Sequence, residues 1–165
     1  MELKSLRTDD FISAVLERYG RTVYTLALSQ TRSREDAEDV FQEVFLRLME
    51  RKAPFESEEH RKAWLIRVTL SRCRSLFASA YRKKRVPLSE DIPFSPPGRS
   101  ALYDAVLALP RGYRTVIHLH YYEGYSTEEI ARLLTVRPST VRSRLFRARK
   151  LLKDQLGGEF LDESL

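Results

Sequence analysis

Apolar residues recur every three or four positions along most of this chain, which is the period of an α-helix. The pattern is clearest between residues 125 and 152. Ser126 stands three residues before Glu129, the spacing of a capping box, and Pro138 suits the first turn of a second helix. Buried stripes are expected at Ile130, Leu133 and Leu134, and then at Val141, Leu145, Ala148 and Leu152. Two helices joined by a tight turn form a helix-turn-helix.

The same period predicts helices in the rest of the chain. They are expected to span residues 8–20, 21–31, 33–50, 58–82, 100–109 and 111–122. Gly20, Pro110 and Gly124 are expected to end helices, because glycine suits a left-handed cap and proline cannot continue a helix. The apolar face of residues 33–50 is expected to carry Val40, Phe41, Val44, Phe45, Leu48 and Met49. The predicted fold class is therefore all-α.

One stretch breaks the helical period. Residues 86–100 contain four prolines and a glycine, and they are predicted to form an extended linker stiffened by proline. This linker divides the chain into two small helical domains, residues 1–85 and residues 101–156, and the second contains the helix-turn-helix. Residues 157–165 open with two glycines and are expected to form a flexible tail.

Charge is distributed unevenly along the chain. The net charge of +6 favours a polyanionic partner. Residues 137–153 contain seven Arg and Lys residues and no acid, so the second helix of the helix-turn-helix is suited to the DNA major groove. Its exposed face is expected to carry Ser139, Arg142, Ser143, Phe146, Arg147 and Lys150. The alternative is an ordinary helical hairpin with a solvated basic face.

The helix at residues 33–50 is acidic instead. Residues 34–50 contain six acids and two arginines. Acids in the first turn complement the helix dipole, but Asp39, Gln42 and Glu43 form a polar patch in the middle of the helix. The pattern alone fits a solvated surface helix and a contact surface equally well.

The helix at residues 58–82 carries the only tryptophan, Trp64, and its C-terminal half is basic. Residues 69–89 contain no acid. Arg72 and Arg74 lie too far from the helix end to be explained by the helix dipole. A basic helix that carries aromatic residues and follows the loop at residues 51–59 suits a nucleic-acid backbone with unstacked bases.

Several classes of protein are not indicated. The single cysteine, Cys73, excludes an internal disulfide and a cysteine-based metal cluster, and it is expected to be buried. Neither a glycine-rich phosphate loop nor a local catalytic signature is present, and His60, His118 and His120 are scattered. No enzyme activity, cofactor or metal is therefore predicted. Without a signal peptide core or a membrane span, the chain is expected to be soluble and cytoplasmic.

Three motifs together resemble the bacterial RNA polymerase sigma factors, specifically the compact two-domain extracytoplasmic-function group. They are DAEDVFQEVFLRL at residues 36–48, AWLIRVTLSRCRS at residues 63–75, and the stretch from LPRGYRTV to RARKLL at residues 109–152. The resemblance covers about residues 11–156. It implies a promoter-specificity subunit that binds core polymerase, recognises two promoter elements and assists DNA melting.

The resemblance also implies roles for particular residues. Contacts with core polymerase are implied for Asp36, Asp39, Gln42 and Glu43, which would face its clamp helices. The polymerase flap is a further contact that the resemblance implies for the chain. Contacts with the downstream promoter element, including a base flipped into the loop at residues 51–59, are implied for Phe55, Trp64, Arg67, Ser71, Arg72 and Arg74. Contacts with the upstream element are implied for Arg137, Ser139, Thr140, Arg142, Ser143, Phe146, Arg147 and Lys150. Ser71 stands where many members have asparagine, which leaves the identity of the flipped base open.

The implied partners are core RNA polymerase, double-stranded promoter DNA, the melted non-template strand and an anti-sigma factor. Neither a small-molecule substrate nor membrane insertion is expected. Two other readings are a stand-alone helix-turn-helix regulator with an N-terminal effector or interaction domain, and an adaptor that only sequesters polymerase. An effector domain would need a pocket with converging polar groups, whereas the first domain offers an acidic helix and a basic aromatic helix.

Overall fold

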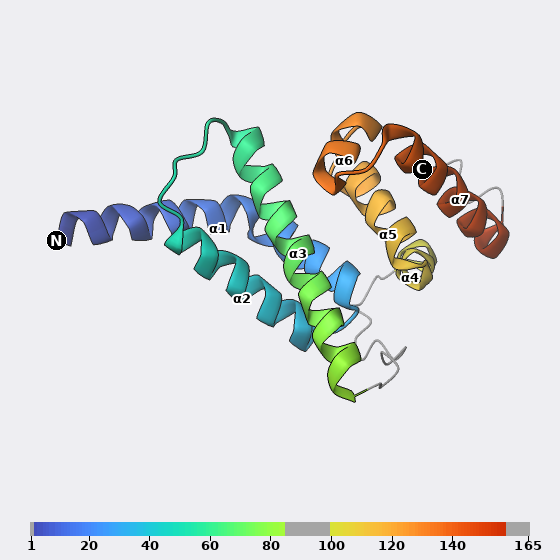
Figure 1. Ribbon diagram of the computed structural model, residues 1–165, viewed down its shortest axis with the longest axis horizontal. Coiled ribbons are helices and arrows are strands. Elements are labelled where there is room, and N and C mark those ends of the chain that lie inside the picture. Colours follow the sequence, from blue (N-terminus) through green and yellow to red (C-terminus); the bar gives the residue numbers. More distant parts are fainter. Residues whose placement is uncertain (1, 85–99, 158–165) are drawn as a thin grey trace. The chain divides into compact units, whose positions relative to one another are not determined.

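The computed structural model describes residues 2–84 and 100–157, with the side chains of residues 9–79 and 100–157. Every regular element in these ranges is a helix, and the helices form two compact units (Figure 1). The predictions of an all-α fold and of two helical domains are confirmed. The predicted linker, except Ser100, and the tail beyond Gly157 lie outside the described residues, so the domain bounds stay a prediction.

The first unit contains three helices, α1 (Glu2–Thr31), α2 (Arg34–Glu50) and α3 (Glu58–Lys84). Two serines cap the N-terminal ends of α2 and α3. The Ser33 hydroxyl accepts a hydrogen bond from the backbone N–H of Asp36 at the start of α2, at 3.3 Å. The Ser57 hydroxyl accepts one from the backbone N–H of His60 at the start of α3, at 3.0 Å. These caps satisfy N–H groups that have no partner inside their helices.

The prediction that Gly20 ends a helix is wrong, because α1 runs through it without a break. Gly20 is buried, and a Cβ atom placed on it would lie 3.8 Å from the Phe41 ring, an ordinary contact. Glycine inside a helix costs about 1 kcal/mol relative to alanine. Val15, Tyr19 and Val23 continue one buried stripe across this position, and their burial offsets that cost.

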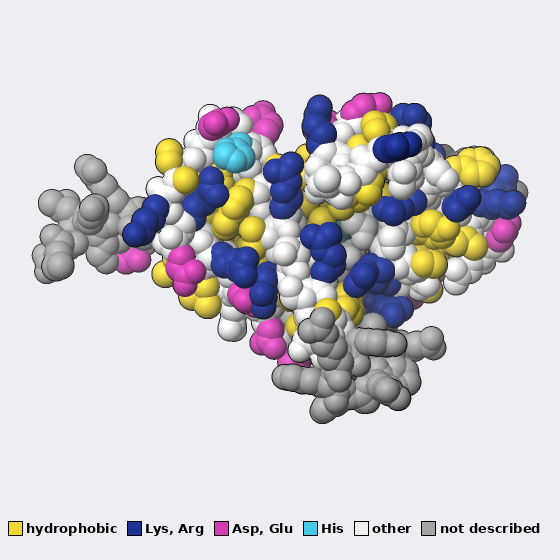
Figure 2. All heavy atoms as spheres, in the orientation of Figure 1, with side chains coloured by type: hydrophobic (Ala, Val, Ile, Leu, Met, Phe, Trp, Pro, Cys, Tyr) yellow, Lys and Arg dark blue, Asp and Glu magenta, His cyan; other side chains and the backbone are white. Residues whose placement is uncertain are grey.

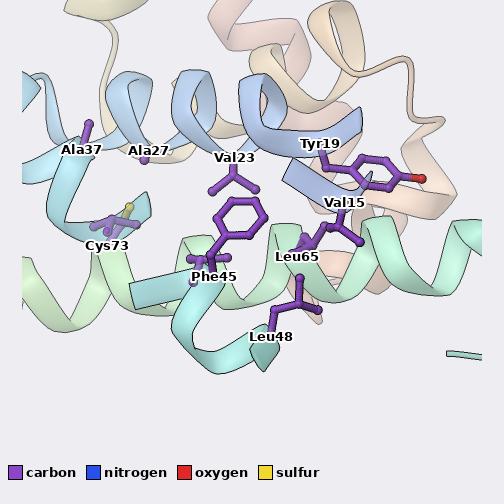
Figure 3. Packing of buried hydrophobic residues seen from close by; sticks show 11 residues of the cluster. Val15, Tyr19, Val23, Ala27, Ala37, Phe45, Leu48, Leu65 and Cys73 are labelled. Atoms are coloured by element: carbon purple, nitrogen blue, oxygen red, sulfur yellow. The ribbon is translucent and has the colours of Figure 1, made fainter. Parts of the chain in front are cut away.

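The core of the first unit draws on all three helices (Figure 3). The Phe45 ring points from α2 toward Val23 of α1, while Leu65 and Cys73 enter from α3. Cys73 is buried as predicted. Met49 is 52% exposed, against expectation. At 100° per residue Met49 lies about 120° around α2 from the buried Ala37, outside the packed face.

The second unit contains α4 (Ala101–Ala108), α5 (Arg111–Ile117), α6 (Thr127–Leu134) and α7 (Pro138–Leu156). Ser100 caps α4, since its hydroxyl accepts a hydrogen bond from the Tyr103 backbone N–H at 3.1 Å. The buried Arg114 guanidinium donates to the backbone carbonyls of Leu107 and Leu109, at 2.9 and 3.2 Å. This side chain therefore satisfies carbonyls at the end of α4 from the following helix.

The helix predicted at residues 111–122 changes type part-way. Its last five residues form a π-helical segment, η1 (His118–Tyr122), in which each turn is wider than in an α-helix. Within this segment the His118 and Tyr122 rings stack, with centroids 5.3 Å apart. Gly124 closes the segment with a φ of 75°, which confirms the predicted end. The spacing of apolar residues correctly predicted a helix over this stretch, but it could not distinguish a π-helical turn from an α-helical one.

Candidate nucleic-acid interface

The predicted helix-turn-helix is formed by α6 and α7. Both hydrogen bonds of the capping box are present, between the side chains and backbone N–H groups of Ser126 and Glu129, at 3.1 and 3.3 Å. Thr135 adopts the left-handed region at a φ of 56°, which makes the turn sharp, and Pro138 begins α7. The stripe of Val141, Leu145, Ala148 and Leu152 is buried as predicted.

The opposite face of α7 is open to solvent. Exposed side chains there belong to Ser139, Arg142, Ser143, Phe146, Arg147 and Lys150. Thr140 is half-buried, and Arg137 is exposed at the N-cap. Phe146 retains 68% of its surface, an unusual exposure for a large apolar side chain on a packed helix. The structure thus brings the predicted upstream-element residues onto about the first four turns of one helix and its N-cap.

Two residues outside α7 contact arginines of α7. Glu128 of α6 lies 4.0 Å from a guanidinium nitrogen of Arg142, and the Thr127 hydroxyl donates to its other carboxylate oxygen at 3.0 Å. A hydrogen bond from the backbone, with those neighbours, lowers the pKa of Glu128. Tyr121 of η1 accepts a hydrogen bond from Arg149 Nε at 2.5 Å. Sequence reasoning missed both contacts, because nothing local links residues 14 and 28 positions apart.

The loop at residues 51–57 forms an aromatic cluster with the start of α3. The Arg51 guanidinium lies 4.4 Å from the centroid of the Phe55 ring and 5.3 Å from that of Trp64. The two rings meet edge to face at 5.6 Å. Arg51 Nε also donates to the Ala53 carbonyl at 3.0 Å, which folds the loop back on itself. Phe55 and Trp64 are both half-buried, so part of each ring remains accessible.

The predicted basic residues of α3 point in two directions. Arg67 and Arg74 are exposed and Ser71 is half-buried, and their spacing of four and three places them on one face of the helix. Arg72 faces α2 instead, where its Nη2 lies 2.5 Å from Glu43 Oε2. Its Nε is buried without a hydrogen-bond partner in the described part of the chain. Two residues predicted to contact different partners therefore contact each other.

The predicted polymerase-binding residues differ in how freely they are presented on α2. Asp39 and Gln42 are exposed, whereas Asp36 is half-buried beside the cap at Ser33. Leu46 and Met49, which the sequence prediction did not single out, are 55% and 52% exposed. Figure 2 shows acidic side chains over the region of α2, interspersed with basic and apolar ones. The second half of α2 thus exposes apolar side chains beside the charged Arg47 and Glu50.

Comparisons with known proteins bear on both units. The family model described as Sigma-70 region 2 matches residues 15–85, and that described as Sigma-70, region 4 matches residues 99–152. RNA polymerase sigma factor SigV of Bacillus subtilis is 30% identical over 164 residues, with 96% of this chain and 98% of that protein covered. The chain belongs to the sigma-70 family, in its extracytoplasmic-function group. ECF RNA polymerase sigma factor SigW of the same organism is 28% identical, covering 89% of each chain.

Two solved structures share the fold of this sigma factor. The sigma factor RpoE from Bartonella quintana, crystallised with the anti-sigma factor NepR, aligns with a TM-score of 0.77 at 23% identity, covering 90% of this chain and 99% of that one. CnrH, in complex with the cytosolic domain of CnrY, aligns with a TM-score of 0.60 at 24% identity, covering 88% and 86%. At these identities the likeness establishes the fold alone. The roles of individual residues have to be argued from the geometry of this chain.

Family membership gives the sigma factor its general role. It is a promoter-specificity subunit that works with core RNA polymerase and promoter DNA in transcription initiation. Sigma factors are non-catalytic initiation factors, consistent with the prediction that the chain is not an enzyme. Within the described ranges, no helix is long and apolar enough to cross a membrane, and no group of three potential ligands could hold a metal ion.

Proposed function

We propose that α7 enters the major groove of the upstream promoter element and reads it directly. The observation that carries this proposal is the division of α7 into a fully packed stripe and an exposed face built from arginine, serine and one phenylalanine. Arginine can donate two hydrogen bonds to guanine, and an apolar ring can contact a thymine methyl group. Arg142, Ser143, Phe146 and Arg147 then read bases. Arg137 and Lys150 lie toward the two ends of this face and contact phosphates.

The loop at residues 51–57 and the outer face of α3 are proposed to bind the melted downstream element. Phe55 and Trp64 offer aromatic surface against which an unstacked base can lie, and such stacking contributes about 1–3 kcal/mol per base. Arg67, Ser71 and Arg74 share one face and follow the strand. Arg72 has a different role in this proposal, because its guanidinium is paired with Glu43 between the helices.

The outer face of α2 is proposed to bind the clamp helices of core polymerase. Asp39 and Gln42 present polar groups there, and Leu46 and Met49 add exposed apolar surface to the same helix. A mixture of apolar and charged groups is typical of a protein interface, since the apolar part contributes affinity and the charges contribute specificity. In the second unit, a contact between its helices and the polymerase flap completes the proposed docking.

An anti-sigma factor is the further partner proposed for this chain. The two structures that share its fold both contain a sigma factor bound to a second protein, named as an anti-sigma factor in the RpoE structure. Exposed apolar side chains on α2 give such a protein a surface to cover. A cytoplasmic location follows from this function, because transcription takes place there.

A run-off transcription assay tests the proposal. The purified protein is combined with core polymerase and with promoters selected from random DNA by the assembled complex. Wild-type protein is expected to direct a transcript of defined length, and the Arg142→Ala variant to direct less of it from the preferred promoter. A stand-alone regulator would bind DNA without core polymerase and would not support initiation by core polymerase alone. A sequestering adaptor would bind core polymerase and yield no transcript.

A further inference from the structure

Glu58 lies where the loop at residues 51–57 meets α3, and its two carboxylate oxygens have different partners. Oε2 accepts a hydrogen bond from the hydroxyl of Tyr19, a buried residue of α1, at 2.7 Å. The same oxygen lies 3.8 Å from the Arg18 guanidinium. Oε1 accepts a hydrogen bond from Arg61 Nη1, one turn along α3, at 2.5 Å. Glu58 thus joins α1 to the first turn of α3 at the base of the loop.

The protonation states at neutral pH favour these contacts. The hydrogen bond from Tyr19, with the nearby Arg61 and Arg18, lowers the pKa of Glu58, so the carboxylate stays charged. Burial, together with the bond to Glu58, raises the pKa of Tyr19, so its hydroxyl keeps the proton that it donates. Charge-assisted hydrogen bonds of this kind are shorter and stronger than neutral ones.

Arg61 connects Glu58 to the aromatic cluster. Its guanidinium lies 5.4 Å from the centroid of the Phe55 ring and 5.1 Å from that of Phe11. The Arg61 side chain retains 22% of its exposure, and its Nε is buried without a hydrogen-bond partner among the described residues. Arg61 is therefore half-buried between the Glu58 carboxylate and the Phe11 and Phe55 rings. Its geometry suits support of the Phe55 ring from within the protein.

We propose that Glu58 is a positioning residue for base capture: it fixes Arg61, and Arg61 fixes Phe55 in the orientation that receives an unstacked base. The inference rests on the proposed role of the loop in binding the melted strand. In this proposal the negatively charged Glu58 strengthens the binding of DNA, which is itself negatively charged. Electrostatics alone would give the opposite sign, because a carboxylate near phosphates weakens binding.

The two explanations predict opposite effects on DNA binding when the charge of Glu58 is removed, so the experiment can distinguish them. Glu58→Gln and the matched control Glu59→Gln each remove one negative charge at adjacent, exposed positions, but Glu59 is not a partner of Tyr19 or Arg61 in this network. Each variant is assembled with core polymerase. Binding is then measured to a promoter with a pre-melted downstream element and to the same promoter with abasic sites across the melted non-template segment.

Glu58→Gln is expected to weaken binding to the pre-melted promoter about tenfold, within the range of one base stack, and to leave binding to the abasic promoter unchanged. Glu59→Gln is expected to leave binding to both unchanged or to strengthen it slightly. In an Arg61→Met background, Glu58→Gln should have no further effect, because the group that it positions is already gone. Fluorescence of Trp64, the only tryptophan, reports whether each variant is folded.

Equal effects of Glu58→Gln and Glu59→Gln would overturn the proposal, as would a full effect of Glu58→Gln in the Arg61→Met background. Should Glu58→Gln fail to fold, Arg61→Met alone must still lose the preference for the pre-melted promoter over the abasic one, or the proposal falls. If the wild-type complex shows no such preference, the role of the loop is wrong and the positioning role with it.

Discussion

The two surfaces proposed to bind DNA are built in opposite ways. On α7 the side chains that face solvent stand at helical spacing on a rigid helix, and their few protein contacts, such as that of Arg142 with Glu128, are exposed. In the first unit, Phe55 is enclosed by Arg51, Arg61 and Trp64, and the loop is anchored through Glu58 to α1. The difference corresponds to the two states of DNA that are proposed to bind.

A duplex presents a regular groove, so a straight helix with free side chains is sufficient to read it. An unstacked base is not held in a regular groove. The protein must therefore provide a site whose side chains are already positioned before the base binds. The ordering entropy of those side chains is then lost during folding rather than during binding. The exposed face of α7 and the loop at residues 51–57, which is anchored through Glu58, correspond to these two requirements.

The largest expected effect is on binding to core polymerase. It concerns α2, which is not proposed to bind DNA, and so tests whether the first unit has a protein-binding surface separate from its DNA-binding loop. Replacing Asp39 and Gln42 by arginine is expected to reduce binding to core polymerase more than about 100-fold, because like-charge contacts cost several kcal/mol at an interface. Both positions are exposed, so the free energy of unfolding should change by no more than about 0.5 kcal/mol per site. Fluorescence anisotropy measures binding, and Glu59→Arg is the matched control. Loss of helicity together with binding would point to a structural role for this patch.

The second prediction sharpens the account of α7. Arg142 and Arg147 are five residues apart, about 7.5 Å along the helix axis, or roughly two base-pair steps. Replacing Arg142 by alanine should cost about 1–3 kcal/mol on the preferred element and relax specificity at one base pair. Replacing Lys150 should weaken binding to all sequences alike and reduce the salt slope by about one. Titrations with matched and scrambled elements at several salt concentrations separate the two. Equal losses from Arg142→Ala on both DNAs would make Arg142 a phosphate contact.

The third prediction concerns Arg72, which belongs to the predicted DNA surface but faces α2. Arg72→Glu is expected to lower the free energy of unfolding by about 1 kcal/mol, since it places two acids together at a half-exposed site. Adding Glu43→Arg should restore most of this loss by reversing the pair. Denaturation followed by Trp64 fluorescence gives both values. If Arg72→Ala instead weakens DNA binding without a change in stability, Arg72 contacts DNA as the family resemblance implies.

The smallest expected effect is the contribution of Glu58 to the pH dependence of the stability of the first unit. The pKa of Glu58 in the folded protein is below its usual value of 4.5, so its contribution to stability is fully present above that value. The contribution is lost as the pH falls through the lowered pKa. Glu58→Gln should therefore reduce the decline in stability of the first unit on acidification, whereas Glu59→Gln should not. Denaturant titrations between pH 7 and pH 3, followed by Trp64 fluorescence, test this. The same decline in Glu58→Gln and wild-type protein would contradict it.

The two surfaces also differ in what the sequence could predict. The capping box, the buried stripe and the exposed face of α7 followed from local spacing, because a helix fixes which residues share a face. The contacts of Glu58 with Tyr19 and of Arg72 with Glu43 did not, since they join residues 39 and 29 positions apart through tertiary packing. Gly20 was misread for a related reason: propensity favoured a helix end, and burial of the surrounding stripe decided otherwise.

One measurement tests the central claim, that the two surfaces bind different states of DNA. Complexes of core polymerase with wild-type protein, Arg142→Ala or Phe55→Ala are compared on three promoters: intact, with a scrambled upstream element, and with abasic sites across the melted non-template segment. The defect of Arg142→Ala should disappear only when the upstream element is scrambled, and that of Phe55→Ala only when the abasic sites are present. A defect of either variant that persists on all three promoters, or that disappears with the other surface's DNA, would contradict the account.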